Sequence, residues 1–450
     1  MDILQSVVQY VLNLGAPVFV PFIMLIIGLI TRMKFKDAFK SALTLGIAFT
    51  GMSLVIDFMM GSISPAAQQL ANNTGVTLNA VDGGWPGMAS ISWAWPYAFL
   101  LFPYCIGINI IMLVTNQTKT LNVDMWNVWN KIFTAVMIWY ISDSILLGFL
   151  VSGIQVILEL KIGDAWGPEV ERLTGIPGVT VPHFITLIAV VLNPINKLMD
   201  KVPFLNKNLD ADYIKDKIGI FGENHVMGAI IGLLLGLAAG YDISKSLNLA
   251  VQAATAMILF PMVSKLFSQA LSPISDGVSE FMRKKFSGKE VYIGLDWPIL
   301  AGRNELWVAV ITTIPFLLLF AIVLPGNSVL PFAGIINLSF VVGALLLTGA
   351  NLVRMIIMGI VTAPIFLYSA TYFAPFITQL ATSTGVVEIP AGMMLTWSTF
   401  EGPDFRYIFA QAASGNLIYI GFAVVWLGLF VWLYKTQMKK NAIYEIANEK

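Results

Sequence analysis

The chain has 450 residues, of which 57% are hydrophobic and only 12% are charged. This charged share is about half that of an average soluble domain, so the sequence predicts a polytopic protein of the lipid bilayer. Lys plus Arg (26) balance Asp plus Glu (26), which argues against a nucleic-acid partner. The single cysteine, Cys105, lies in an apolar run and leaves no disulfide, metal cluster or reactive thiol to expect.

Apolar runs long enough to cross or nearly cross a bilayer predict about eleven helical spans. We therefore expect an all-α polytopic membrane protein. Two of the runs, near 179 and 226, are short and edged by Pro or Gly, which indicates broken or tilted helices. In chain order the runs are 15–31, 41–60, 94–115, 132–158, 179–195, 226–240, 248–271, 306–324, 329–348, 351–375 and 416–434.

The distribution of basic residues predicts the orientation. Four of them at 32–40 follow the first span, whereas residues 62–92 contain none. The pattern then inverts, because five lysines at 197–217 precede the sixth span and four basic residues at 283–289 follow the seventh. With the lysines at 435–440, the positive-inside rule places the N-terminus outside and the C-terminus in the cytoplasm.

The second half of the chain repeats patterns of the first at a spacing of about 205 to 214 residues. Because the basic flanks invert between the halves, we expect two inverted repeats. The predicted division is a first repeat at 1–195, a cytoplasmic linker at 196–225, a second repeat at 226–405, and the last span with its tail at 406–450. The matching patterns are Asp37 to Ser41 with Asp242 to Ser246, Ser64-Pro65 with Ser272-Pro273, Asp82 and Trp85-Pro86 with Asp296 and Trp297-Pro298, and Val181-Pro182 with Ile389-Pro390.

Two Gly/Pro-broken segments, 62–92 and 274–303, are predicted re-entrant hairpins that enter from opposite faces and meet near the midplane. Each carries an acid beside a tryptophan, at Asp82 with Trp85 and at Asp296. An indole can pack on the apolar face of a polyol while a carboxylate accepts its hydroxyl groups, so the pattern favours a sugar-like ligand. The alternative is that each acid caps a hairpin helix.

Uncharged polar side chains point to a neutral ligand. Within 121–130 indoles alternate with amides, and Asn127 and Asn130 are expected on one helical face with Asp124. These groups suit a polyhydroxyl compound better than an ion, although an interfacial aromatic belt is the alternative. His183 follows a proline inside an apolar run, where we expect ligand contact rather than a satisfied core histidine.

A charged strip, Arg303-Asn304-Glu305, follows the second hairpin. Each charge would cost on the order of 3 kcal/mol at a bilayer centre without a partner, and Arg303 is a candidate partner of Asp296 before substrate binds. Walker motifs, paired-metal spacings and Ser-His-Asp arrangements do not occur in a plausible context. No catalytic residue, metal ligand or cofactor is therefore expected in this chain.

Six motifs carry a family resemblance that covers essentially the whole chain: NVDMWNVW, GVTVPH, IGIFGE, AGYD, IGLD and PGNSVLPF. In their spacing they resemble the galactitol-type membrane subunit (enzyme IIC, EIIC) of the bacterial phosphoenolpyruvate-dependent phosphotransferase system, in the ascorbate-galactitol superfamily. The resemblance implies an inner-membrane homodimer in which a scaffold domain holds a mobile core that moves as an elevator. It also implies that a sugar alcohol is phosphorylated at the cytoplasmic face by a separate EIIB, whose cysteine is charged by EIIA and, upstream, by the histidine phosphocarrier protein.

The chain departs from the galactitol members at expected pocket positions. It has Phe184 after Pro-His where they tend to have Gly, Arg303-Asn304 in place of a His-Thr pair, and Asn130 in place of a His. The substrate is therefore expected to be galactitol, another hexitol or pentitol, or a related sugar. The expected substrate-binding residues are Asp82, Trp85, Asn127, Asn130, His183, Asp296, Arg303, Asn304 and Glu305.

Two further classes of function remain open from the sequence. In an ion-coupled secondary transporter of a polar solute, Asp82, Asp296 and Glu305 would be ligands of protons or sodium. A membrane enzyme without transport is the more distant alternative.

Overall fold

The computed structural model describes residues 16–30, 32–73, 79–82, 84–93, 95, 97–122, 124, 127–206, 224–285, 291–331, 338–384 and 394–448. Most of them are helical, as expected, with six short strands that the sequence did not predict. The helices are α2 (Ala16–Ile30), α3 (Phe35–Asn73), α4 (Gly84–Trp93), α5 (Ala98–Val114), α6 (Val128–Ser142), α7 (Ile145–Thr174), η1 (Phe184–Ile188), α8 (Ala189–Met199), η2 (Pro203–Asn206), α10 (Asn224–Ala238), α11 (Ile243–Lys285), η4 (Trp297–Leu300), α12 (Asn304–Val323), α13 (Phe340–Thr348), α14 (Leu352–Thr384), α15 (Pro403–Ala413) and α16 (Leu417–Asn448). The strands are β1 (Ala80–Asp82), β2 (Thr120–Asn122), β3 (Val179–Thr180), β4 (Tyr292–Gly294), β5 (Val329–Leu330) and β6 (Met394–Thr396).

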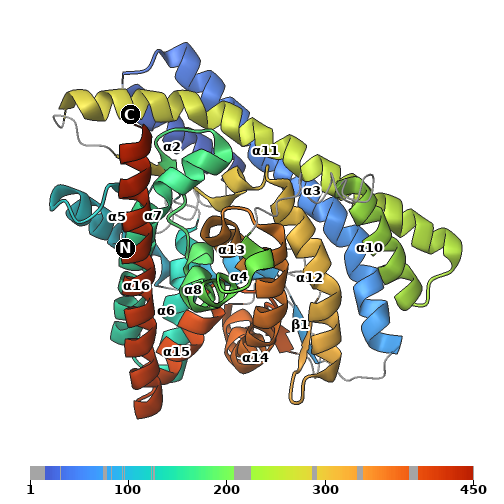
Figure 1. Ribbon diagram of the computed structural model, residues 1–450. Coiled ribbons are helices and arrows are strands. Elements are labelled where there is room, and N and C mark those ends of the chain that lie inside the picture. Colours follow the sequence, from blue (N-terminus) through green and yellow to red (C-terminus); the bar gives the residue numbers. More distant parts are fainter. Residues whose placement is uncertain are drawn as a thin grey trace.

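Helices α2, α3, α10 and α11 pack against one another along one side of the molecule (Figure 1). α3 has 39 residues and α11 has 43, about twice what a helix needs to cross a bilayer. Small residues allow α10 to approach α11 closely, because a Cβ atom at Gly232 would lie 2.7 Å from the carbonyl oxygen of Leu249. Such small-residue contacts are typical of helix packing in membranes.

The other helices form a second group, in which α6 packs on α7, α12 on α14, and α15 on α16 (Figure 1). Large aromatic side chains fill the core of this group. Among the described residues, six tryptophans are almost completely buried: Trp95, Trp129, Trp166, Trp307, Trp397 and Trp426.

Two three-stranded parallel sheets join the halves of the chain. β1 lies between β5 and β6, and β4 lies between β2 and β3. Each sheet thus takes its central strand from one half and both outer strands from the other. Strand pairing satisfies the backbone polar groups where the helices are interrupted, which non-helical backbone at membrane depth requires.

Four described helices are long and apolar enough to cross a membrane: Ile145–Thr174, Asn304–Val323, Leu352–Ser383 and Leu417–Ile443. The prediction of one span at 132–158 is wrong. Asp143 ends α6 in the left-handed conformation, and the side chain of Ser144 then caps α7 by accepting a hydrogen bond from the Leu147 N–H. The runs 179–195 and 329–348 each begin in a strand rather than forming a single helix.

The C-terminal ends of α7, α8 and α16 carry ion pairs. Lys440 Nζ lies 3.4 Å from Glu169 Oε2, and Arg354 Nη1 donates to Asp200 Oδ1 at 2.8 Å. Partial burial raises the pKa of Asp200, but the hydrogen bond from Arg354 and the charge of Lys197 outweigh it and leave this pKa below its usual value.

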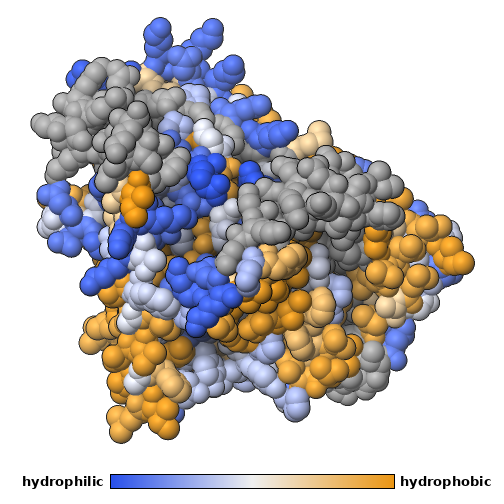
Figure 2. Space-filling model, viewed as in Figure 1, coloured by the Kyte–Doolittle hydropathy of each residue, from blue (hydrophilic) through white to orange (hydrophobic). Residues whose placement is uncertain are grey.

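In Figure 2 hydrophilic residues gather toward the top, where α16 ends in Figure 1, and hydrophobic residues cover much of the lower part.

Candidate functional site

His183 lies between two carboxylates deep in the second helix group. Its Nε2 is 3.4 Å from Asp296 Oδ1, and its Nδ1 is 3.5 Å from Glu401 Oε2. The residue is only 1% exposed, and Nδ1 also accepts the Ile185 N–H at the start of η1. The preceding Pro182 packs so closely on Gly294 of β4 that a Cβ there would lie 2.5 Å from it, so the sheet fixes the position of the imidazole.

Asp296 follows β4 and caps η4, where its Oδ1 accepts the Trp297 N–H at 2.7 Å. Asp296 therefore caps a helix, as the alternative predicted. Its carboxylate also faces the His183 imidazole and the Asn127 amide. The Asn127 amide donates to Asp124 and interacts with Asp296 as well. The expectation that Asp124 shares a helix with the two asparagines is wrong, because α6 begins only at Val128; Asn127 nevertheless lies beside Asp124.

Asn130 connects the cluster to α15. Its amide nitrogen donates to Glu401, and its amide oxygen accepts from Arg406. The Arg406 guanidinium is fully buried, donates also to Thr134 Oγ1 at 2.9 Å, and lies 4.6 Å from the ring centroid of Phe184. Arg406 therefore holds α6, η1 and the start of α15 together.

A buried ion pair between Lys131 and Glu159 connects α6 to α7. Lys131 Nζ lies 2.6 Å from Glu159 Oε2 of α7, and both side chains are almost fully buried. Gln155 donates to Glu159 at 2.8 Å and lies 3.4 Å from the amide oxygen of Asn130. Because breaking a buried pair leaves an uncompensated charge, this arrangement fixes the rotation of α6 and with it Asn127 and Asn130.

Asp82 belongs to a different set of contacts from Asp296. It is the last residue of β1, accepts the Gly84 N–H at 2.9 Å and receives a hydrogen bond from Ser398 beyond β6. Trp129, next to Asn130 in α6, and Trp397, next to Ser398, have ring centroids 5.7 Å apart. Both indole N–H groups are buried without a hydrogen-bond partner among the described residues, and buried indoles usually find one.

The other predicted site residues lie elsewhere. Arg303 pairs with Glu305 at 2.6 Å, so the suggested pairing of Arg303 with Asp296 is wrong. Asn304 is exposed as the first residue of α12, and Trp85 is half-buried against the hydrophobic core. The structure thus brings together four of the nine predicted residues: Asn127, Asn130, His183 and Asp296.

Sequence reasoning missed four charged members of the cluster and its support: Lys131, Glu159, Glu401 and Arg406. Lys131 and Glu159 did carry a signal, since each interrupts or borders the apolar run 132–158. Glu401 and Arg406 lie in a polar stretch before the last span that resembles an ordinary loop, and only burial distinguishes it.

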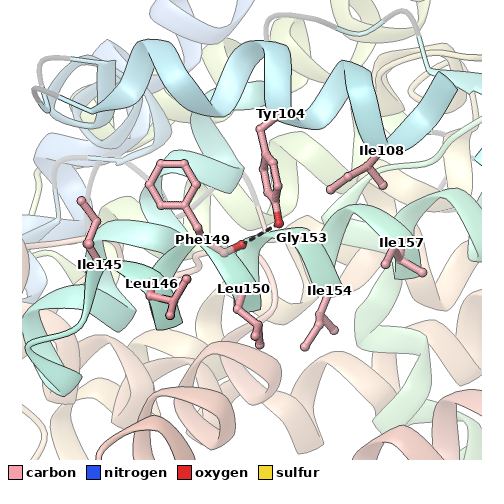
Figure 3. Close-up of a pocket in the computed structure, with 9 residues that line it drawn as sticks. All are labelled: Tyr104, Ile108, Ile145, Leu146, Phe149, Leu150, Gly153, Ile154 and Ile157. Carbon is pink, nitrogen blue, oxygen red and sulfur yellow. Dashed lines mark hydrogen bonds between the residues drawn. The ribbon is translucent and has the colours of Figure 1, made fainter. Parts of the chain in front are cut away.

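An apolar groove between α5 and α7 does not have the chemistry of a polar-solute site. Figure 3 shows its lining, in which only Tyr104 carries a polar side-chain atom, and this hydroxyl donates to the Phe149 carbonyl oxygen at 3.2 Å. The other lining residues are Ile108, Ile145, Leu146, Phe149, Leu150, Gly153, Ile154 and Ile157. Ligand hydroxyl groups would find only the Tyr104 hydroxyl as a side-chain partner in this groove, whereas the His183 cluster offers carboxylate and amide acceptors together with amide donors.

Comparison with known proteins agrees with the resemblance of the motifs. Residues 10–392 match the EIIC-GAT family, described as "PTS system sugar-specific permease component". The chain is 35% identical over 427 residues to the "PTS system galactitol-specific EIIC component" of Escherichia coli (strain K12), covering 94% of this chain and 93% of that protein. It is 34% identical over 419 residues to a "Putative permease IIC component" of the same organism, covering 90% of this chain and 96% of that one. The chain therefore belongs to the EIIC-GAT family of sugar-specific permease components of the phosphotransferase system (PTS).

Proposed function

We propose that this permease component binds a sugar alcohol, galactitol or a related hexitol or pentitol, at the cluster around His183 and carries it inward. The observation that carries the proposal is the buried contact of His183 with Asp296 and Glu401, flanked by Asn127 and Asn130. A relative with 35% identity over nearly the full length is named as galactitol-specific, which supports the substrate class.

The chemistry of the cluster fits a neutral polyol. Carboxylates accept hydroxyl protons, and charge-assisted hydrogen bonds of this kind contribute roughly 1.5 to 3 kcal/mol each. The amides of Asn127 and Asn130 can both donate and accept, so they match hydroxyl groups that do the same. The Trp129 and Trp397 indoles, beside Asn130 and Ser398 in the chain, are two buried donors without a partner among the described residues.

Transport is proposed to follow an elevator movement of a core against a scaffold within a homodimer. The packing supports such a division, because α2, α3, α10 and α11 form one group and the helices around the cluster form another. The order of the strands supports two inverted repeats. The strands β4, β5 and β6 of the second half correspond in order to β1, β2 and β3 of the first half, and each sheet combines strands from both halves. A core tied by both sheets would move as one body.

Phosphorylation is assigned to a separate EIIB, which receives its phosphoryl group from EIIA. The only cysteine of this chain, Cys105, is buried in α5, so a phosphocysteine would have to come from another protein.

The family and the four apolar helices make the chain a multi-pass inner-membrane protein. We place the C-terminus of α16, and the ion pairs of Glu169 and Asp200 near it, at the cytoplasmic face, with the N-terminus outside.

The test uses cells that produce the chain with its EIIA and EIIB partners and receive radiolabelled galactitol. The proposal predicts that the label appears inside as a phosphate ester and that its accumulation requires phosphoenolpyruvate. Accumulation of free galactitol driven by an ion gradient would overturn it and favour the ion-coupled transporter. Glu305 offers little to such an ion, because its carboxylate is already held by Arg303.

A further inference from the structure

The apolar groove between α5 and α7 shares no lining residue with the His183 cluster. Its volume is about 730 Å³, and two helices supply the lining that Figure 3 shows. Leu146 and Leu150 in this lining are 73% and 50% exposed, so the groove opens at the surface of the molecule. In a protein of the bilayer, a hollowed apolar surface of this kind faces either lipid or another protein.

The groove has the length of a lipid acyl chain. Its α7 residues run from Ile145 to Ile157, which is about 18 Å along the helix at 1.5 Å per residue. Half of the hydrocarbon core of a bilayer, the depth of one leaflet, is about 15 Å. The one polar group of the lining, the Tyr104 hydroxyl, already donates to the Phe149 carbonyl oxygen. An acyl chain in the groove would therefore meet an apolar lining along its length.

Two lysines gather at one end of the groove. Lys161 lies four residues after Ile157, the last lining residue of α7, and is therefore on the same face of the helix, about 6 Å further along. Its Nζ donates to the carbonyl oxygen of Gln117, in the turn after α5. Lys119, two residues after Gln117, is exposed. Basic side chains from both sides of the groove thus stand where the apolar lining ends.

An acid near these lysines is occupied within the protein. Asp164 is only 7% exposed, and its Oδ1 accepts the hydroxyl groups of Thr118 and Thr120 at 2.8 Å and the backbone N–H of Lys119 at 2.9 Å. The Lys161 ammonium has three donor hydrogens, of which a backbone carbonyl takes one. Two lysines and one buried acid leave this end of the groove positive.

We propose that the groove binds an acyl chain of an anionic phospholipid and that Lys161 and Lys119 hold its phosphate. Basic pockets between transmembrane helices bind anionic lipid headgroups in this way. Beyond Lys161, α7 meets the end of α16, where the Asn441 amide donates to the Ala165 carbonyl oxygen at 2.8 Å. The headgroup would therefore lie at the face that we place in the cytoplasm. This lipid site does not depend on the polyol site.

The charge of the site is tested by native mass spectrometry of the full chain, purified in detergent. Phosphatidylglycerol is compared with phosphatidylcholine of the same acyl chains, and the wild-type protein is expected to retain phosphatidylglycerol in preference. Lys161→Gln and Lys119→Gln should each lower the affinity for phosphatidylglycerol roughly fivefold, since a basic residue near anionic lipid contributes about 1 kcal/mol. Lys36→Gln, exposed near the start of α3, is the matched control and should bind as the wild type does.

A filled groove tests the acyl chain separately. Leu150→Trp places a larger side chain in the groove at a half-exposed position, and it is expected to abolish the preferential retention of phosphatidylglycerol. Leu247→Trp is the matched control, because Leu247 of α11 is 51% exposed and lies outside the groove lining. It should retain the lipid as the wild type does.

Three results would overturn the inference. The first is equal retention of the two lipids by the wild-type protein. The second is a loss in Lys36→Gln as large as that in Lys161→Gln, which would show only a general attraction between basic residues and anionic lipid. The third is a Leu150→Trp protein that retains phosphatidylglycerol but no longer forms the dimer seen for the wild type, which would assign the groove to a second copy of the chain.

Discussion

The imidazole of His183 and the carboxylate of Asp296 face each other at 3.4 Å, although they come from opposite halves of the chain. Each follows a strand of the same sheet, β3 for the histidine and β4 for the acid, so the parallel pairing of these strands sets their distance. Asp82 and Ser398 show a similar relationship in the other sheet, where Asp82 is the last residue of β1 and Ser398 follows β6. In both sheets, an acid at or just after the end of the central strand meets a polar side chain from the other half.

His183 can be tested against the other histidine. We expect His183→Gln to weaken galactitol binding by roughly 1 to 3 kcal/mol, the cost of leaving buried polar partners unmatched. The exposed His225→Gln is the control and should bind as the wild type does. Isothermal titration of the purified proteins measures both. Equal affinity in all three would return His183 to a structural role.

Arg406 is expected to stabilise the cluster rather than bind substrate. Lys at this position keeps the charge but loses the planar fork that reaches Thr134 and Asn130 and the stacking on Phe184. Arg406→Lys should therefore lower the free energy of unfolding by about 1 to 3 kcal/mol, visible as a lower melting temperature in detergent. Arg172→Lys, at a partly exposed pair within α7, is the control. A wild-type melting temperature for Arg406→Lys would contradict the network.

Gly402 combines a backbone requirement with a close approach. Its φ is +58°, and a Cβ atom would lie 2.3 Å from a ring carbon of Phe184, the neighbour of His183. Gly402→Ala should displace this ring and weaken polyol binding more than Gly415→Ala, whose φ is +87° but whose surroundings are open. Comparing the two variants separates backbone strain from the clash. Similar affinities in both would mean that the position of Phe184 does not matter for binding.

The proposed inversion of the two repeats predicts the sidedness of matched positions. Lys40 and Lys245 occupy corresponding places near the starts of α3 and α11, and both are exposed. In a Cys105→Ala background, a membrane-impermeant maleimide added to intact cells should label Lys245→Cys and leave Lys40→Cys unlabelled until the membrane is opened. Labelling of both positions from the same side would rule out inverted repeats.

The breaks at Asp82 and Asp296 were predictable, because Gly and Pro beside an acid interrupt an apolar run and the structure is non-helical at both. Strands of two or three residues show no periodicity, and each pairs with a segment from the other half, so the sequence could not reveal the sheets. The end of α6 at Asp143 was missed because only three polar residues, Ser142 to Ser144, interrupt the run there.

Residues 389–391, the expected counterpart of Val181 to His183, lie outside the described part of the chain, as do 74–78 and 286–290 of the predicted hairpins.

The central claim is that a polyol binds at the carboxylates around His183, and galactitol titration of purified Asp296→Asn tests it most directly. The substitution keeps the shape and the capping oxygen of the side chain but removes its charge, which weakens its hydrogen bonds to hydroxyl groups. We predict at least about a tenfold loss of affinity, equivalent to roughly 1.4 kcal/mol, with expression and melting temperature preserved and with Asp143→Asn unchanged. Wild-type affinity in a folded Asp296→Asn protein would mean that this acid only caps η4 and that the polyol binds elsewhere.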